Sequence, residues 1–156
     1  MKSVLFVCLG NICRSPTAKA VFDHRLARAG LDVATDSAGT TAYHVGSPPD
    51  RRAIETAQRW GLDIGAQRAR VVTREDFVRF DRIYAMDRAN LTHLEDMAPS
   101  DRRARIELVM RLVPDYGVEE VPDPYYGGED GFARVLDMLE AAADALVEEL
   151  TLCRNR

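Results

Sequence analysis

Residues 4–16 read Val4-Leu5-Phe6-Val7-Cys8-Leu9-Gly10-Asn11-Ile12-Cys13-Arg14-Ser15-Pro16, an apolar run followed by a short loop and a helix start. The apolar run predicts a buried strand. Ser15 suits the N-cap of the next helix, and Pro16 suits its first helical position. Cys8 and Arg14 bracket a loop that is short enough to curl around one tetrahedral oxyanion. We call residues 8–15 the cradle loop.

The cradle loop combines the groups that phosphoryl transfer needs. Backbone N–H groups that converge at a helix N-terminus form an anion site, and the positive helix end favours a thiolate at Cys8. The planar guanidinium of Arg14 can hold two phosphate oxygens at once. A nucleophilic thiolate inside a phosphate site indicates transfer through a phosphocysteine.

The rest of the chain alternates between strand and helix patterns, which predicts a parallel sheet with helices on both faces. Ligands bind at the carboxyl ends of the strands in such folds, where Cys8 falls. The 156 residues predict a single domain, residues 1–156. Strands are expected at Ser3–Val7, Val33–Ala38, Arg82–Ala85 and Arg105–Val109, and helices at Pro16–Ala29, Asp50–Trp60, Thr73–Phe80, Arg88–Met97 and Phe132–Leu150.

The segment Val7–Pro16 resembles the signature loop of the low-molecular-weight protein tyrosine phosphatases. The likeness continues in the family's order through Asp36–Thr40, Tyr43–Asp50, Thr73–Phe77, Ala85–Asp87 and Val121–Gly127, and so covers essentially the whole chain. It implies a three-layer α/β fold with a four-stranded parallel sheet in the order 2-1-3-4. It also implies a metal-independent enzyme, without a cofactor, that hydrolyses phosphotyrosine through a phosphocysteine.

The resemblance assigns roles to individual residues. Cys8 is the expected nucleophile, Arg14 and the amides of the cradle loop bind phosphate, and Asp123 is the general acid and then the general base. Taken alone, an aspartate beside Pro124 in a long loop fits a structural role equally well. The loop residues expected at the phosphate are Leu9, Gly10, Asn11, Ile12, Cys13 and Ser15.

Other residues are expected around this centre. Tyr43, Tyr125 and Tyr126 resemble the aromatic walls beside a phosphotyrosine ring, although three half-exposed loop tyrosines would also fit. Ser37 resembles a hydroxyl that supports the nucleophile region. Gln67 stands where many relatives carry a histidine that braces the loop asparagine, and glutamine does not titrate near neutral pH.

Residues outside this set have no expected catalytic role. Asp87 is expected to cap a helix near the site. His24, His44 and His93 are dispersed without ligand spacing, so surface positions and no metal site are expected. Cys153 is expected to be a bystander.

Composition limits the range of partners. The net charge of −4 and the lack of a long basic block argue against nucleic acid. No apolar stretch is long enough for a membrane span, and three cysteines do not form a disulfide framework. We therefore expect a cytoplasmic protein that acts on tyrosine-phosphorylated proteins, and a tyrosine kinase is a further candidate partner.

Three other functions are compatible with this loop. An arsenate reductase would need further cysteines to relay a disulfide, and the chain has none between Cys13 and Cys153. A protein arginine phosphatase resembles this chain more closely, but relatives of that type carry threonine at the position of Ile12. A phosphocysteine carrier of a sugar-transport system would not need Asp123.

Overall fold

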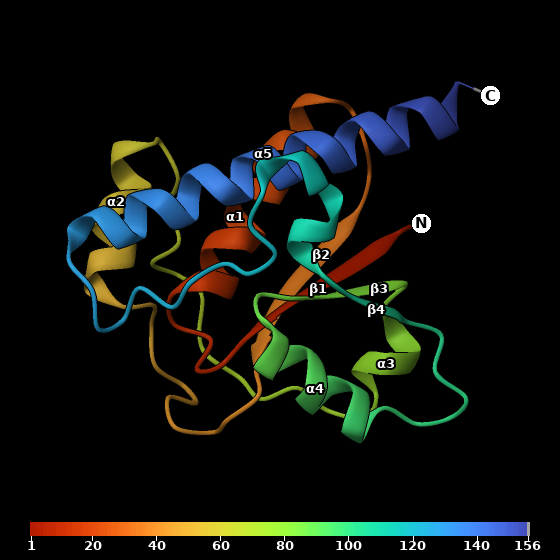
Figure 1. Ribbon diagram of the computed structural model, residues 1–156, viewed down its shortest axis with the longest axis horizontal. Helices are drawn as coiled ribbons and strands as arrows, with labels where there is room; N and C mark the ends of the chain where they lie inside the picture. Colours follow the sequence, from red (N-terminus) through yellow and green to blue (C-terminus); the bar gives the residue numbers. More distant parts are fainter. Residues whose placement is uncertain (156) are drawn as a thin grey trace.

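The computed structural model describes residues 1–155, and its centre is a four-stranded parallel sheet (Figure 1). The strand order is β2-β1-β3-β4, as the resemblance implied. Every neighbouring pair is parallel, so the carboxyl ends of the strands share one edge. The strands are β1 (Ser3–Cys8), β2 (Ala34–Gly39), β3 (Arg82–Ala85) and β4 (Arg105–Leu108).

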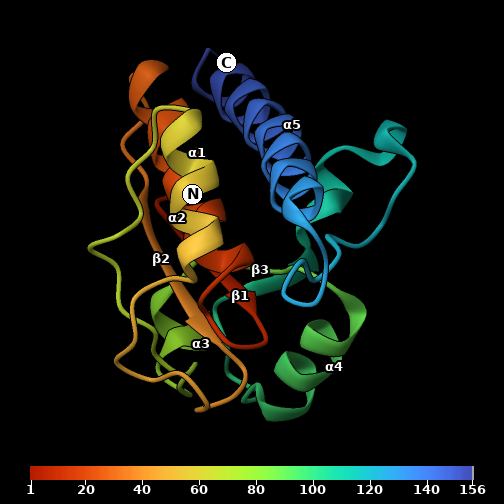
Figure 2. The same ribbon diagram turned by 90° about the vertical axis from the view of Figure 1, so that its left-hand side faces the viewer.

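Helices cover both faces of the sheet, which confirms the predicted three layers (Figures 1 and 2). One face carries α1 (Arg14–Arg28) and α5 (Glu129–Arg154), and α2 (Arg51–Arg59) packs against α5. The other face carries α3 (Asp76–Arg79) and α4 (Arg88–Met97). Two short 3₁₀ helices, η1 (Val109–Leu112) and η2 (Pro114–Tyr116), follow β4.

The central strand β1 is fixed by burial on both sides. Val4 and Phe6 belong to the core under α1 and α5, whereas Leu5 and Val7 belong to the core under α3 and α4. All four side chains are fully buried, and each contributes about 1.5–3 kcal/mol of hydrophobic stabilisation. Cys8, the last residue of β1, is therefore held at the middle of the carboxyl edge.

Several predicted boundaries need correction. Helix α1 begins at Arg14 with Cys13 at the N-cap, so Ser15 is not the cap. The hydroxyl of Ser15 is instead engaged by Cys8 and Asn11 inside the cradle loop. Gly30, with φ of 68°, ends the helix as expected.

The last helix is longer than predicted, since α5 extends beyond Phe132–Leu150 at both ends. Within residues 1–155, no helix combines the length and apolarity needed to cross a membrane.

Candidate active site

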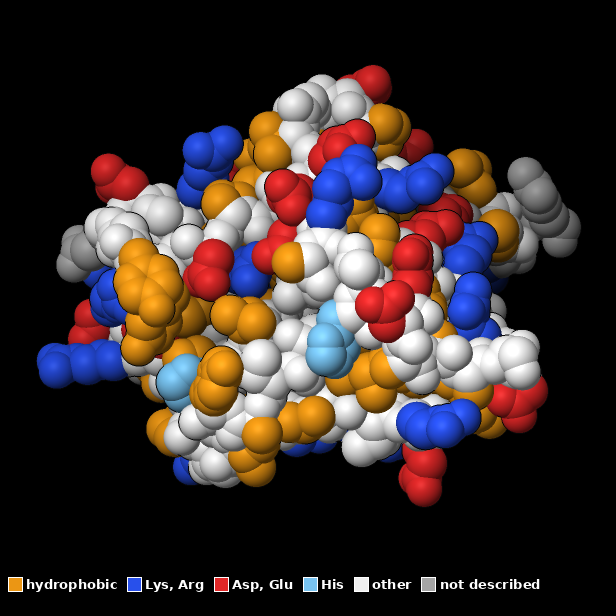
Figure 3. Space-filling model, turned by 60° about the horizontal axis from the view of Figure 1, so that its bottom comes forward, with side chains coloured by type: hydrophobic (Ala, Val, Ile, Leu, Met, Phe, Trp, Pro, Cys, Tyr) orange, Lys and Arg blue, Asp and Glu red, His pale blue; other side chains and the backbone are white. Residues whose placement is uncertain are grey.

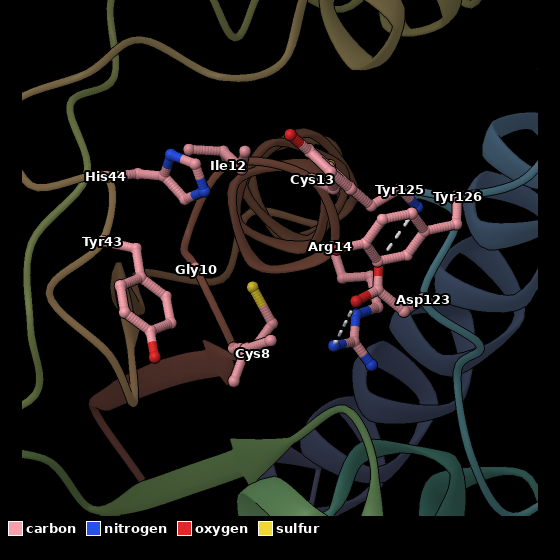
Figure 4. Close-up of a pocket in the computed structure, with 11 residues that line it drawn as sticks. Cys8, Gly10, Ile12, Cys13, Arg14, Tyr43, His44, Asp123, Tyr125 and Tyr126 are labelled. Carbon is pink, nitrogen blue, oxygen red and sulfur yellow. Dashed lines mark hydrogen bonds and ion pairs between the residues drawn. The ribbon is translucent and has the colours of Figure 1, made fainter.

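The cradle loop leads from the end of β1 into α1 and forms the floor of a cavity of about 320 Å³ (Figure 4). The cavity therefore lies at the carboxyl edge of the sheet, where the fold predicts a ligand site. Its lining residues are Cys8, Leu9, Gly10, Ile12, Cys13, Arg14, Tyr43, His44, Asp123, Tyr125 and Tyr126.

The thiol of Cys8 faces hydrogen-bond donors. Its Sγ lies 3.0 Å from Ser15 Oγ and accepts a hydrogen bond of 3.3 Å from the backbone N–H of Asn11. The Ser15 hydroxyl also accepts from Asn11 Nδ2 at 2.7 Å, and its own proton has two acceptors within reach, the Cys8 sulfur at 3.0 Å and the carbonyl of Ala38 at 3.4 Å. These polar groups and the nearby N-terminus of α1 surround the sulfur at the floor of the cavity.

The backbone of Asn11 gives the cradle loop its curvature. Asn11 has φ of 58° and, among residues 1–155, is the non-glycine residue in the left-handed region. Its Nδ2 donates to Ser15 and, at 2.9 Å, to Ser37 Oγ, while its Oδ1 accepts the N–H of Arg70 at 3.0 Å. These bonds hold a backbone conformation that would otherwise be costly.

Gln67 does not contact Asn11 directly, although it stands where many relatives carry a histidine that braces this asparagine. It approaches Ser37 at 3.4 Å and donates from Nε2 to the carbonyl of Pro16 at 2.9 Å, so it reaches Asn11 only through Ser37. The direct brace on Asn11 Oδ1 is the backbone amide of Arg70. A backbone donor leaves no trace in the sequence, which explains why it was missed.

The guanidinium of Arg14 is buried and oriented by two acceptors. Nη1 donates to Asp87 Oδ2 at 2.6 Å and to the carbonyl of Val121 at 3.0 Å. These two bonds use only Nη1, so Nε and Nη2 are available to a ligand, with Asp123 Oδ2 at 3.7 Å from Nη2. Burial alone would lower the pKa of Arg14, but the charges of Cys8, Asp87 and Asp123 outweigh it and raise this pKa.

The two cysteines of the loop have different environments. Cys13 is 5% exposed, and burial, followed by the charges of Asp50, Cys8 and Asp123, raises the pKa of its thiol far above the ordinary value. Cys13 is accordingly a neutral thiol, whereas Cys8 faces the donors described above. The arrangement favours Cys8 as the nucleophile.

Asp123 lies across the cavity from Cys8, on the segment 121–128, which we call the acid loop (Figure 4). Its Oδ2 is 3.7 Å from Arg14 Nη2, and its Oδ1 accepts the N–H of Tyr125 at 3.0 Å. The loop starts from Val121, which is fully buried and donates its N–H to the carbonyl of Met86. A carboxyl group thus stands next to the position that a phosphate would occupy.

Tyr43, Tyr125 and Tyr126 all line the cavity. The rings of Tyr125 and Tyr126 meet edge to face with centroids 4.9 Å apart, and Tyr43 comes from the loop after β2. Tyr43 and Tyr126 are 82% and 93% exposed, so both can contact a bound molecule. Figure 3 shows hydrophobic side chains gathered on the side of the molecule where these loops meet, beside basic side chains.

One residue of the site was not identified from the sequence, and a second makes a contact that was not expected. His44 was expected on the surface, yet it lines the cavity and packs so closely on Gly10 that a Cβ there would lie 2.9 Å from its ring. Asp87 caps α4 as expected and also pairs with Arg14. His24, His93 and Cys153 are exposed, and the side chains that the structure describes include no cluster of His, Cys, Asp and Glu suited to a metal ion.

Comparisons with known proteins agree with this geometry. Residues 3–155 match the model of a family described as low molecular weight phosphotyrosine protein phosphatase. A Schizosaccharomyces pombe protein of the same description is 45% identical over 132 residues, which cover 83% of this chain and 84% of the relative.

Two solved structures are also similar. A protein tyrosine phosphatase from Entamoeba histolytica, crystallised with Hepes in its active site, has a TM-score of 0.93 and 40% identity over 99% of both chains. A Drosophila arginine phosphatase has a TM-score of 0.90 and 33% identity, over 96% of this chain and 98% of its own.

Proposed function

Since the chain belongs to the low molecular weight phosphotyrosine protein phosphatase family, we propose that it hydrolyses phosphotyrosine in proteins through a phosphocysteine on Cys8. The observation that carries this proposal is the position of Cys8 Sγ. It lies at the floor of a cavity, with the Asn11 N–H and the Ser15 hydroxyl directed at it. Arg14 and Asp123 line the same cavity.

In the first step, the Cys8 thiolate attacks phosphorus and the bond from phosphorus to the phenolic oxygen breaks. The loop amides and Arg14 stabilise the negative charge on the equatorial oxygens. Asp123 donates its proton to the departing oxygen, so tyrosine leaves as a neutral phenol. The total charge is unchanged, because the negative charge of the Cys8 thiolate is lost as the sulfur bonds to phosphorus and a negative charge appears on Asp123 as it gives up its proton.

In the second step, water attacks the phosphocysteine and the phosphorus–sulfur bond breaks. Asp123, now a carboxylate, accepts a proton from that water, and inorganic phosphate is released. The sulfur leaves as a thiolate, which the Asn11 N–H and the Ser15 hydroxyl stabilise again. The same donors therefore serve the nucleophile and the leaving group.

The rim supports an aryl phosphate as substrate. The rings of Tyr43, Tyr125 and Tyr126 stand around the mouth of the cavity, where a phosphotyrosine ring would pass between them. Aromatic pairs add about 0.5–1.5 kcal/mol beyond simple area burial. Serine and threonine phosphates lack a ring for these contacts.

Arginine phosphatase activity is the second candidate, because a Drosophila arginine phosphatase is among the similar structures. The residue that argues against it is Ile12, which lines the cavity with an apolar side chain. An isoleucine offers no hydrogen bond to the guanidinium of phosphoarginine.

Thiol-coupled arsenate reduction has less support. Beyond Cys8 and Cys13, the remaining cysteine is Cys153 near the far end of α5. It lies 21 residues after Phe132, a separation of roughly 30 Å along an α-helix. A disulfide joins Cα atoms no more than about 7 Å apart, so a cysteine this far along α5 is poorly placed to relay one to the start of the helix. A phosphocysteine carrier has no use for Asp123.

Phosphotyrosine proteins are the expected partners, and a tyrosine kinase that produces them is a further one. We also propose that the protein works in the cytoplasm. All three cysteines are free, and thiols persist in reducing compartments.

The decisive experiment measures turnover of phosphotyrosine, phosphoarginine and phosphoserine peptides side by side in a metal chelator. Phosphotyrosine should give the highest kcat/KM. Faster hydrolysis of phosphoarginine would replace the first candidate with the second, and a requirement for metal would contradict the mechanism.

A further inference from the structure

We propose that Arg52 is a positioning residue that joins the acid loop to the cradle loop and so fixes Asp123 over Cys8. The inference rests on the proposed role of Asp123 and deepens it. Arg52 is the second residue of α2 and is not among the residues that line the cavity, so any effect on the reaction passes through other groups.

The first contact joins Arg52 to Asp50. Nε and Nη2 of Arg52 donate to the two carboxylate oxygens of Asp50, each at 3.1 Å. Burial raises the pKa of Asp50, but the hydrogen bonds and charge of Arg52 outweigh burial and lower it. Asp50 therefore stays ionised and keeps the guanidinium plane in one orientation.

Asp50 is tied in turn to the cradle loop. Its backbone N–H donates to the carbonyl of Ile12 at 2.8 Å, and its carboxylate caps α2 by accepting the N–H of Arg52 at 2.8 Å. The start of α2 and the cradle loop are thus one connected unit, which supplies a rigid base for the Arg52 side chain.

The remaining donors of Arg52 hold the acid loop. Nη2 donates to the carbonyl of Tyr125 at 2.8 Å, and Nη1 approaches the carbonyl of Gly127 at 3.5 Å. The guanidinium carbon lies 5.5 Å from the ring centroid of Tyr125 and 4.8 Å from that of Phe132. One side chain therefore reaches two carbonyls and one ring of the acid loop, together with the Phe132 ring near the start of α5.

Tyr125 connects Arg52 to Asp123 through its backbone. Its carbonyl accepts from Arg52, and its N–H donates to Asp123 Oδ1 at 3.0 Å. Asp123 is 37% exposed, and its contact with Arg14 is 3.7 Å long, so the Tyr125 N–H is its short hydrogen bond. Releasing Tyr125 from Arg52 would let the carboxyl group drift from the leaving oxygen.

The test compares Arg52→Gln with Arg51→Gln. Arg51 precedes it on α2, is 88% exposed and pairs with Glu55, one turn along the same helix. Arg52→Gln should lower kcat/KM for a phosphotyrosine peptide by roughly 10- to 100-fold, the scale of a displaced catalytic group. The loss should be much smaller for p-nitrophenyl phosphate, whose more acidic leaving group needs less protonation. Arg51→Gln should leave both kcat/KM values unchanged. Arg52→Lys should give an intermediate loss of kcat/KM, because an ammonium group cannot bind the Asp50 carboxylate and the acid-loop carbonyls together.

A double-mutant cycle shows whether Arg52 acts through Asp123. In an Asp123→Ala background, Arg52→Gln should cause no further loss with phosphotyrosine, and inhibition by inorganic phosphate should be unchanged throughout. Three results would overturn the proposal: an equal loss of kcat/KM for the two substrates, weaker inhibition by phosphate, or a further loss of kcat/KM in the double variant. Each would show that Arg52 acts through the cradle loop or the general fold and not through Asp123.

Hydrogen exchange gives a readout that does not depend on activity. The amides of residues 123 and 125–127 should exchange faster in Arg52→Gln than in wild type or Arg51→Gln, while those of β1 stay protected. If Arg52→Gln leaves exchange in the acid loop unchanged, Arg52 does not hold this loop and the proposal is wrong. If wild type has no phosphatase activity but Arg52→Gln still speeds exchange in the acid loop, the proposed function is contradicted while the structural role of Arg52 stands.

Discussion

The Nη1 group of Arg14 donates to Oδ2 of Asp87 over 2.6 Å, while Oδ1 of the same carboxylate accepts the N–H of Asn90 and caps α4. The Asp87 carboxylate therefore binds the buried Arg14 and caps the start of α4 at the same time. The pair orients the guanidinium before any ligand arrives, so the enzyme does not spend ligand-binding free energy on this ordering.

Replacing Asp87 with asparagine separates the two roles. Asparagine is an equally good N-cap, so the melting temperature should change little. The charge on Arg14 loses its partner, and affinity for inorganic phosphate should fall about tenfold, equivalent to about 1.4 kcal/mol. Competitive inhibition by phosphate measures this. If Asp87→Asn unfolds more readily but binds phosphate as wild type does, Asp87 only caps α4 and does not orient Arg14 for phosphate.

Cys8→Ser should abolish turnover while inorganic phosphate still binds, because an alcohol is a far weaker nucleophile than a thiolate. Steady-state assays and calorimetric titration with phosphate measure the two effects. Cys153→Ser, a change at an exposed cysteine, is the matched control and should retain activity. Residual turnover above the detection limit in a Cys8→Ser preparation would assign the nucleophile elsewhere.

Asp123→Ala should lower kcat/KM for phosphotyrosine by about 10²–10⁴, the usual contribution of general acid catalysis. Aryl phosphates with more acidic leaving groups should lose less, because they depart without a proton. The measurement is a plot of log kcat/KM against leaving-group pKa, which should become steeper in the variant. Parallel lines for wild type and variant would exclude the acid role.

Asp50 gives a pH-dependent contribution to stability. Its pKa is lowered in the folded state from the ordinary 3.8, since the hydrogen bonds and charge of Arg52 exceed the effect of burial. The stabilisation is therefore complete above that value and is lost as pH falls through the lower folded pKa. Asp50→Asn keeps a capping side chain and should cost about 0.5–1 kcal/mol near neutral pH.

Urea unfolding at several pH values measures this difference. The gap between Asp50→Asn and wild type should close in strong acid, where both side chains are neutral. Asp32→Asn, a change at an exposed aspartate, serves as the control. A gap that persists unchanged at low pH would show that the ion pair with Arg52 does not contribute.

The sequence was most informative where the chemistry lies on one contiguous segment. Cys8, Asn11 and Arg14 fall within a single loop, so strand pattern and helix start were enough to place them together. The sheet order followed from the family resemblance, and the alternation of strands and helices supported it. The helix start was misplaced because Ser15, a good capping residue, bonds to Cys8 and Asn11 instead.

Contacts between distant segments were not predictable in the same way. Arg14 meets Asp87 across 73 positions, and the Arg70 amide meets Asn11 across 59. His44 reaches the cavity because its loop folds back over Gly10, a placement that depends on packing rather than on any local pattern. Backbone partners carry no residue signature, so only the fold identifies them.

The choice between phosphotyrosine and phosphoarginine depends on Ile12. Its side chain is 8% exposed, lines the cavity and packs in the cluster that includes Ala53 and Phe132. We expect wild type to prefer phosphotyrosine and Ile12→Thr to narrow or reverse the ratio of kcat/KM values, because the new hydroxyl can bond to the phosphoarginine group or to water. A pocket change of this size shifts discrimination by about 1–3 kcal/mol, or roughly 10- to 200-fold.

Ile12→Val is the matched control for this prediction, since valine has the shape of threonine without its hydroxyl. It should keep the preference for phosphotyrosine, whereas Ile12→Thr should not, and peptides that differ only in the phosphorylated residue give the ratio directly. If valine shifts the ratio as far as threonine does, lost volume rather than hydrogen bonding sets the specificity. If wild type already cleaves phosphoarginine faster, the phosphotyrosine assignment is wrong, while the phosphocysteine mechanism, which uses the same cradle loop for both substrates, still holds.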